Sequence, residues 1–350
     1  MQVDRRRVAF RVLAAALVVA ALRYGVDWDG VLRNLRDADL RLFALAPVGA
    51  ALALFAGAEG TRLALGFDAH SERASLARRA FLGAAVVRNL VPAGNVGGGG
   101  FVAYTVSRHG DVGVSEALAG VTTWEFVVMA ASAVVGALGL AGVSVAGRDP
   151  AGVVESVALF VVALGAAVAA VAALSAYRGP VAAAVSRVTE AAHPVLARVA
   201  PNYDGPVSAA DARDGIDEFF AALGALAADR GRFASVLLAA HATWACWVVA
   251  LYASLLAVGV VVSPAVAMVA VTVSGFARAV PVPAGLGPVD AALGGLLVAL
   301  TPHPLVGLGS ALVLNRGGML LVQASVGGLA LWTLDRRVVA STAGAPDAEN

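Results

Sequence analysis

The chain has 350 residues, of which 59% are hydrophobic and only 14% are charged, whereas soluble domains average about 25% charged residues. Its net charge of +1 and its single cysteine, Cys246, exclude a large nucleic-acid footprint, a disulfide framework and a cysteine-rich zinc site. Apolar stretches recur between residues 8 and 334, so the composition predicts one integral membrane domain over residues 1–350.

The first half of the chain predicts four membrane spans. They are expected at residues 8–22, 42–60, 115–140 and 153–177. Residues 24–41 place apolar side chains among charges, which predicts a short interfacial helix. Residues 62–79 are polar, and a glycine-rich apolar segment at 80–107 follows them.

The second half predicts two further spans, which makes six in all. They are expected at residues 233–258 and 305–334. A polar loop at 178–232 precedes them, with weakly amphipathic helical pieces, and the tail at 338–350 is expected to be disordered. A second interrupted apolar segment lies between these two spans, at 264–300.

The placement of arginine predicts the orientation in the cell membrane. The N-terminus, the loops at 62–79 and 178–232 and the C-terminal Arg336 and Arg337 are basic, which places both termini and these loops in the cytoplasm. The segment 24–41 is also rich in arginine and would lie outside, but nearby acidic residues offset its charge.

Each interrupted segment contains a Pro-Ala-Gly helix breaker, in "VPAGNVGGGG" at residues 91–100 and in "VPAGLGP" at residues 282–288. A break near the middle leaves arms of roughly 10–14 residues, which are too short to cross a hydrocarbon core of about 30 Å comfortably. We therefore predict two re-entrant helical hairpins, which enter from opposite sides of the membrane. Exposed backbone at that depth requires burial in protein or a hydrated cavity.

The two halves also match without gaps at a fixed spacing. Pro92 and Pro283 are 191 positions apart, and the same spacing relates Glu125 to Arg316. Residues 42–140 and 233–334 would then be copies of one unit of span, hairpin and span. With one further span between them, the copies face opposite ways, as in transporters that alternate access around a midplane site. The alternative is that sequence rich in Ala, Gly and Val matches itself by chance.

These motifs resemble the lysylphosphatidylglycerol synthase transmembrane-region family, also called flippase-like, over residues 5–335. The first family motif is an Asn-x-x-Pro with following glycines and a downstream glutamate, here Asn89, Pro92, "GNVGGG" and Glu125. The second is a proline- and glycine-rich turn with a later arginine, here "PVPAGLGPVD" at 281–290 and Arg316. The chain differs from the family pattern at Gly98 to Gly100, where charged residues are common, and at Asp290, which replaces a glutamate.

Ionisable groups inside a membrane are costly and usually face the interior of the bundle. The candidate substrate-binding residues are Arg88, Asn89, Pro92, Asn95, Arg108, Glu125, Arg278, Pro283, Asp290 and Arg316. The arginines would hold a lipid phosphate by bidentate hydrogen bonds, and the two carboxylates would act as counter-charges or proton carriers. The alternative is a purely structural Glu125–Arg316 pair. Both interpretations predict that these two residues lie close together.

The resemblance implies a non-enzymatic protein that moves the head group of a phospholipid or polyprenyl-phosphate sugar between leaflets. Its partners would be membrane lipids, with a separate transferase as a second candidate partner, and it would bind no nucleic acid, cofactor or metal. No ATPase motif is present, so transport would be downhill or ion-coupled. The alternatives are an accessory subunit or enzyme that supports a separate glycosyl- or aminoacyl-transferase, and a transporter for a small solute.

Overall fold

The computed structural model describes residues 28–90, 94–147, 176–199, 208–279 and 287–343, together with residues 155, 158 and 162. Helices are the only regular elements in this part of the chain, which confirms the prediction of an all-α polytopic membrane protein. The predicted span at 8–22 and nearly all of the one at 153–177 lie outside the described residues.

Four helices are long and apolar enough to cross a membrane, and all four were predicted. They are α3 (Leu40–Ala64), α6 (Val114–Ala146), α10 (Arg230–Ala257) and the part of α13 (Leu305–Ala343) that ends at Leu334. The helix α13 continues through residues 338–343, where a disordered tail was expected. The short amphipathic helix α2 (Trp28–Arg36) matches the predicted interfacial helix, and Asn34 donates a hydrogen bond from its amide to the Ser310 hydroxyl of α13 over 3.3 Å.

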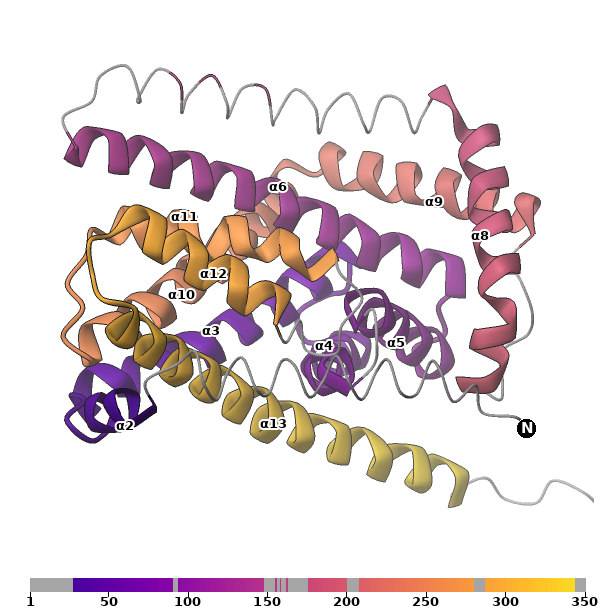
Figure 1. Cartoon of the computed structure of the whole chain (residues 1–350). Helices are drawn as coiled ribbons and strands as arrows, with labels where there is room; N and C mark the ends of the chain where they lie inside the picture. The colour runs from indigo at the N-terminus through magenta and orange to yellow at the C-terminus, as the bar shows by residue number, and fades with distance from the viewer. Residues whose placement is uncertain are drawn as a thin grey trace, which may run out of the picture.

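The helices α3 and α10 form an antiparallel pair at the centre of the bundle (Figure 1). At one end the Asp39 amide donates to the Ala257 carbonyl over 2.8 Å. At the other end Arg232 donates from Nε to the Leu63 carbonyl and from Nη2 to the Ala64 carbonyl, each over 2.7 Å. The start of each helix therefore lies beside the end of the other.

Each helix of this pair is followed by one of the interrupted segments. The first consists of α4 (Glu72–Leu90) and α5 (Gly94–His109), and the second of α11 (Pro264–Gly275), the 3₁₀ turn η1 (Phe276–Ala279) and α12 (Pro288–Leu300). Because α3 and α10 are antiparallel, the two segments start from opposite ends of the bundle.

The first arm is longer than predicted, because α4 has 19 residues and begins at Glu72 rather than near residue 80. The Ser71 hydroxyl accepts a hydrogen bond from the Ala74 amide over 3.1 Å and caps the helix start. Ala74, Ala77 and Ala80 are buried at a spacing of three residues, so this charged stretch carries an apolar helix face. Only residues 65–71 connect α3 to α4.

The segment expected to be a polar loop forms α8 (Arg178–Val199) and α9 (Ala209–Ala228). A capping box between Ser208 and Asp211 starts α9. This helix packs on α6, where the rings of Phe126 and Phe219 meet edge to face with centroids 6.3 Å apart. The second half of the polar segment is therefore attached to the bundle.

Helix ends and helix contacts in the two halves correspond. The helices α5 and α12 end at His109 and Leu300, and α6 and α13 begin at Val114 and Leu305, so both pairs of ends are 191 positions apart. The first arm α4 packs against α13 of the other half, and the first arm α11 packs against α6. Each half therefore contacts the other in the same way.

Candidate functional site

A cavity of about 490 Å³ lies beside the interruptions of the two segments, and we call it the central cavity. The last turn of α4, the glycines of α5 and the η1 turn all contribute to its wall, together with α3, α6, α10 and α13. Nearly every helix of the core therefore contributes residues to the wall of this cavity.

Arg88, in the last turn of α4, is the residue that joins the first hairpin to α6. Its Nη2 donates to Glu125 Oε1 over 2.7 Å, and its guanidinium lies 5.1 Å from the centre of the Phe81 ring. Its Nε is buried and has no hydrogen-bond partner among the described residues. An unpaired buried donor of this kind costs free energy, because it has given up its hydrogen bonds to water.

The glycine run of α5 allows this position of Arg88. A Cβ at Gly98 would lie 2.3 Å from Arg88 Cγ and 2.5 Å from its Nε, and a Cβ at Gly94 would lie 1.9 Å from the Arg88 carbonyl oxygen. Gly99 and Gly100 line the cavity instead, and Gly100 would place a Cβ in open space. The run therefore combines close packing at two positions with cavity lining at the others.

Arg316 on α13 pairs with Asp290, which starts α12. Arg316 Nε lies 3.4 Å from Asp290 Oδ1. The Asp290 carboxylate also accepts from the Gly287 amide over 3.2 Å, which fixes it at the start of the helix. Gly287 has a φ of +94°, a backbone conformation that glycine adopts most readily.

Arg278, in η1, is exposed to the cavity and makes no ion pair or hydrogen bond within the described part of the chain. With Arg88 and Arg316 it brings three arginines to the cavity wall, where Glu125 is the carboxylate among the lining residues. Even with Asp290 counted, the cavity carries an excess of positive charge.

Five of the predicted site residues therefore meet in the central cavity: Arg88, Asn89, Glu125, Arg278 and Arg316. Asp290 joins them through Arg316. Pro92 and Pro283 lie outside the described residues, and so does the side chain of Asn95.

The ion pairs differ from the alternative, structural pairing of Glu125 with Arg316. Both residues line the cavity, but Glu125 pairs with Arg88 and Arg316 with Asp290. The hairpins reach so far into the bundle that each charged span residue meets a hairpin residue of its own half.

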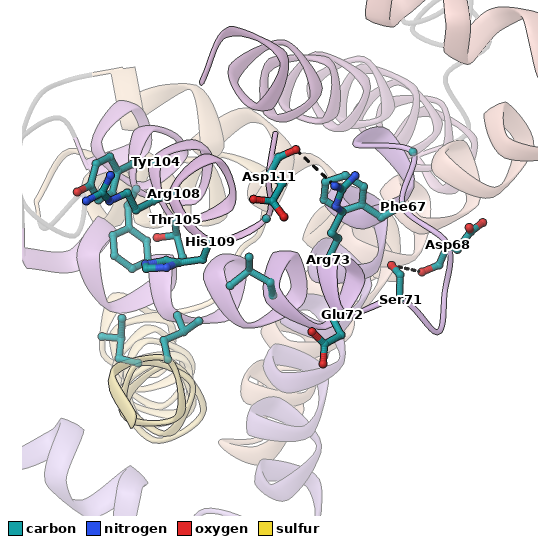
Figure 2. A pocket seen from close by; sticks show the side chains of 16 residues that line it. Phe67, Asp68, Ser71, Glu72, Arg73, Tyr104, Thr105, Arg108, His109 and Asp111 are labelled. Carbon is teal, nitrogen blue, oxygen red and sulfur yellow. Dashed lines mark hydrogen bonds between the residues drawn. The ribbon is translucent and has the colours of Figure 1, made fainter. Parts of the chain in front are cut away.

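Arg108 is a predicted site residue that does not line the central cavity. It lies at the other end of α5, 14 residues after Gly94, which is about 21 Å along a helix. There it lines a second pocket of about 1210 Å³, which we call the outer pocket (Figure 2).

Sequence reasoning missed several residues of the central cavity. Gln323 accepts a hydrogen bond from the Asn89 amide over 2.6 Å and lines the cavity. It follows Arg316 by seven residues, which places both on one helix face, so this spacing could have identified it. Trp124, Trp244 and Trp247 also line the cavity, but nothing in their spacing distinguishes them from core residues.

A known protein family matches the sequence of this chain. The family model of the lysylphosphatidylglycerol synthase TM region matches residues 8–327. The chain belongs to this family. As a lysylphosphatidylglycerol synthase TM region protein, it is a membrane protein with a lipid-related function. No curated protein matches the sequence significantly. Among the described residues, no group of three or more His, Cys, Asp or Glu side chains could hold a metal ion.

Proposed function

We propose that this protein moves the phosphate-bearing head group of an anionic lipid between leaflets through the central cavity. The observation that supports the proposal most directly is the excess of arginine where the two interrupted segments meet, with Arg278 unpaired within the described residues. Guanidinium groups bind phosphate by paired, charge-assisted hydrogen bonds. A neutral solute would not require this charge.

The ion pairs of the cavity suggest how a phosphate would be exchanged. Arg278 would bind it first, because this side chain gives up no other partner. Arg88 and Arg316 would then turn from Glu125 and Asp290 toward the phosphate. Glu125 and Asp290 would pair with Arg88 and Arg316 again as the lipid leaves, so these two arginines would not be left unpaired.

Access from alternate sides would follow from a duplicated, inverted architecture. The antiparallel α3–α10 pair, the helix ends at a spacing of 191 residues and the reciprocal packing of α4 on α13 and α11 on α6 support this part of the proposal. In such transporters, one repeat moves against the other around a fixed site. Lipid tails would remain outside, beside exposed apolar side chains such as Phe55, Leu138 and Leu329.

The test is a lipid-scrambling assay with the purified full-length protein in proteoliposomes. Fluorescent phosphatidylglycerol and a fluorescent polyprenyl phosphate serve as probes, and a membrane-impermeant reductant reports their arrival in the outer leaflet. We expect Arg278→Gln to slow movement at least 10-fold, and Glu125→Gln and Arg316→Gln to slow it as well. Arg36→Gln, an exposed arginine of α2, is the matched control and should retain the wild-type rate.

Normal rates in all three cavity variants would remove these residues from the mechanism. A wild-type protein that moves neither probe faster than empty liposomes would contradict lipid transport and favour a role beside a separate transferase.

A further inference from the structure

The outer pocket lies at the base of the first hairpin and shares no lining residue with the central cavity. The start of α4, the end of α5, the 65–71 connection and the α13 residues Leu331 and Leu334 surround it (Figure 2). The proposed function does not use it, although it is larger than the central cavity.

One face of α5 carries the groups in this pocket that could bind a ligand. Phe101, Tyr104, Thr105 and Arg108 follow the spacing of a single helix face, and all four line the pocket. Thr105 is only 7% exposed, and its hydroxyl makes no hydrogen bond within the described part of the chain. The hydroxyl oxygen itself is not fully enclosed, so it is free to bond a ligand in the pocket that this residue lines. Arg108 is exposed and forms no ion pair with any described residue.

The opposite wall is held in place before any ligand binds. Arg62 pairs with Glu59 over 2.7 Å and donates to the Phe67 carbonyl. Arg78 donates from Nε to the same glutamate over 2.8 Å and from Nη1 to the Ala69 carbonyl over 3.0 Å. These bonds fix the 65–71 connection, so little ordering would oppose binding.

The charged side chains of the pocket are unevenly distributed, and Asp111 lies between its two sides. Figure 2 shows Tyr104, Thr105, Arg108 and His109 on one side, and Asp68 and Glu72 on the other with Arg73. Arg73 donates to the backbone carbonyl of Asp111 over 3.4 Å. An anionic group would therefore be bound on the α5 side. Beside that face, Phe101, Leu331 and Leu334 provide an apolar surface suited to acyl chains.

The second half of the chain lacks these polar groups at the positions 191 residues later. Tyr104, Thr105 and Arg108 correspond to Gly295, Leu296 and Ala299 of α12. The helix packing that both halves share therefore does not require a hydroxyl or a guanidinium here. The polar face serves a purpose specific to this end of the bundle.

We propose that the outer pocket is a second lipid site, which binds the phosphate of one lipid through Thr105 and Arg108 and its acyl chains against α13. This site is separate from the central cavity and does not depend on transport.

The test is native mass spectrometry of the full-length protein in detergent, with Arg278→Gln as the background so that the central cavity contributes little. The probes are dioctanoyl phosphatidic acid and dioctanoylglycerol, with inorganic phosphate as a competitor. We expect one phosphatidic acid to be retained and dioctanoylglycerol to be lost. Thr105→Val and Arg108→Gln should each reduce retention at least 5-fold, whereas Ser107→Ala, on the same helix but outside the pocket, should not.

Equal retention of phosphatidic acid by the Thr105→Val, Arg108→Gln and background proteins would contradict this site. Similar unfolding temperatures of the three proteins would show that they are all folded. Equal retention of dioctanoylglycerol would show that no phosphate is recognised. Displacement by millimolar inorganic phosphate would instead identify a site for free phosphate. Because the readout is binding, these outcomes are independent of any failure of the scrambling assay.

Discussion

Arg88 lies so close to Gly98 that a single methyl group at this glycine would displace it. Sequence reasoning identified Arg88, Glu125, Arg278 and Arg316 because charges are rare in apolar segments. It did not predict the pairing of Glu125 with Arg88, because the pairing depends on how deeply each hairpin enters the bundle. It grouped Arg108 with these residues, because charge alone does not show which side chains reach the cavity.

We predict that Gly98→Ala destabilises the protein by about 1–3 kcal/mol, as overpacking does elsewhere. The new Cβ would move Arg88 and break its 2.7 Å bond to Glu125. Thermal unfolding in detergent measures the change. Gly100→Ala is the matched control, because its Cβ would meet no atom within 4 Å. Equal unfolding temperatures for the two variants would argue against this packing.

At the scale of elements, hydropathy predicted the four long helices well, because length and apolar content decide whether a helix can cross a membrane. The predicted start of α4 was wrong. Arg73, Arg78 and Arg79 make this stretch polar in composition, although its alanines form an apolar helix face. Contacts between helices could not be predicted from hydropathy, since in a membrane they depend on small residues that allow close approach. Gly327 of α13 is such a residue, beside Leu82 and Val86 of α4.

We predict that Gly327→Ala separates α13 from α4 and lowers stability by about 2 kcal/mol or more. Its Cβ would lie 2.8 Å from the Leu82 carbonyl oxygen, which cannot move without the helix. Gly328→Ala meets nothing within 4 Å and should be neutral or slightly stabilising, because alanine favours helix. A urea or thermal unfolding series compares the two. A neutral Gly327→Ala would contradict the close contact of these helices.

At the scale of the whole molecule, the repeat was predicted because both Pro-Ala-Gly motifs keep one ungapped spacing, and it stays a prediction. The structure adds helix ends at that spacing and an antiparallel central pair. Orientation in the membrane still rests on the distribution of arginine. Two exposed residues can test this orientation, because α3 lies between them. They are Asp37, before the helix, and His70, after it.

We predict that these two positions are accessible from opposite sides of the cell membrane. In a Cys246→Ala background, a cysteine at Asp37 should react with an impermeant maleimide in intact cells. A cysteine at His70 should react only after permeabilisation, because the basic 62–79 loop is expected in the cytoplasm. Reaction of both from one side would refute this orientation.

Glu125 and Arg316 occupy matching positions 191 residues apart but carry opposite charges. This difference limits how such a bundle could be assembled from separate halves. Two identical half-length chains, associated head to tail, would bring together either two carboxylates or two guanidinium groups at these related positions. Joining the halves in one polypeptide permits one of each sign. In the transport cycle proposed above, this difference would make the inward- and outward-facing forms chemically unlike, so the protein would favour one of them even without a gradient.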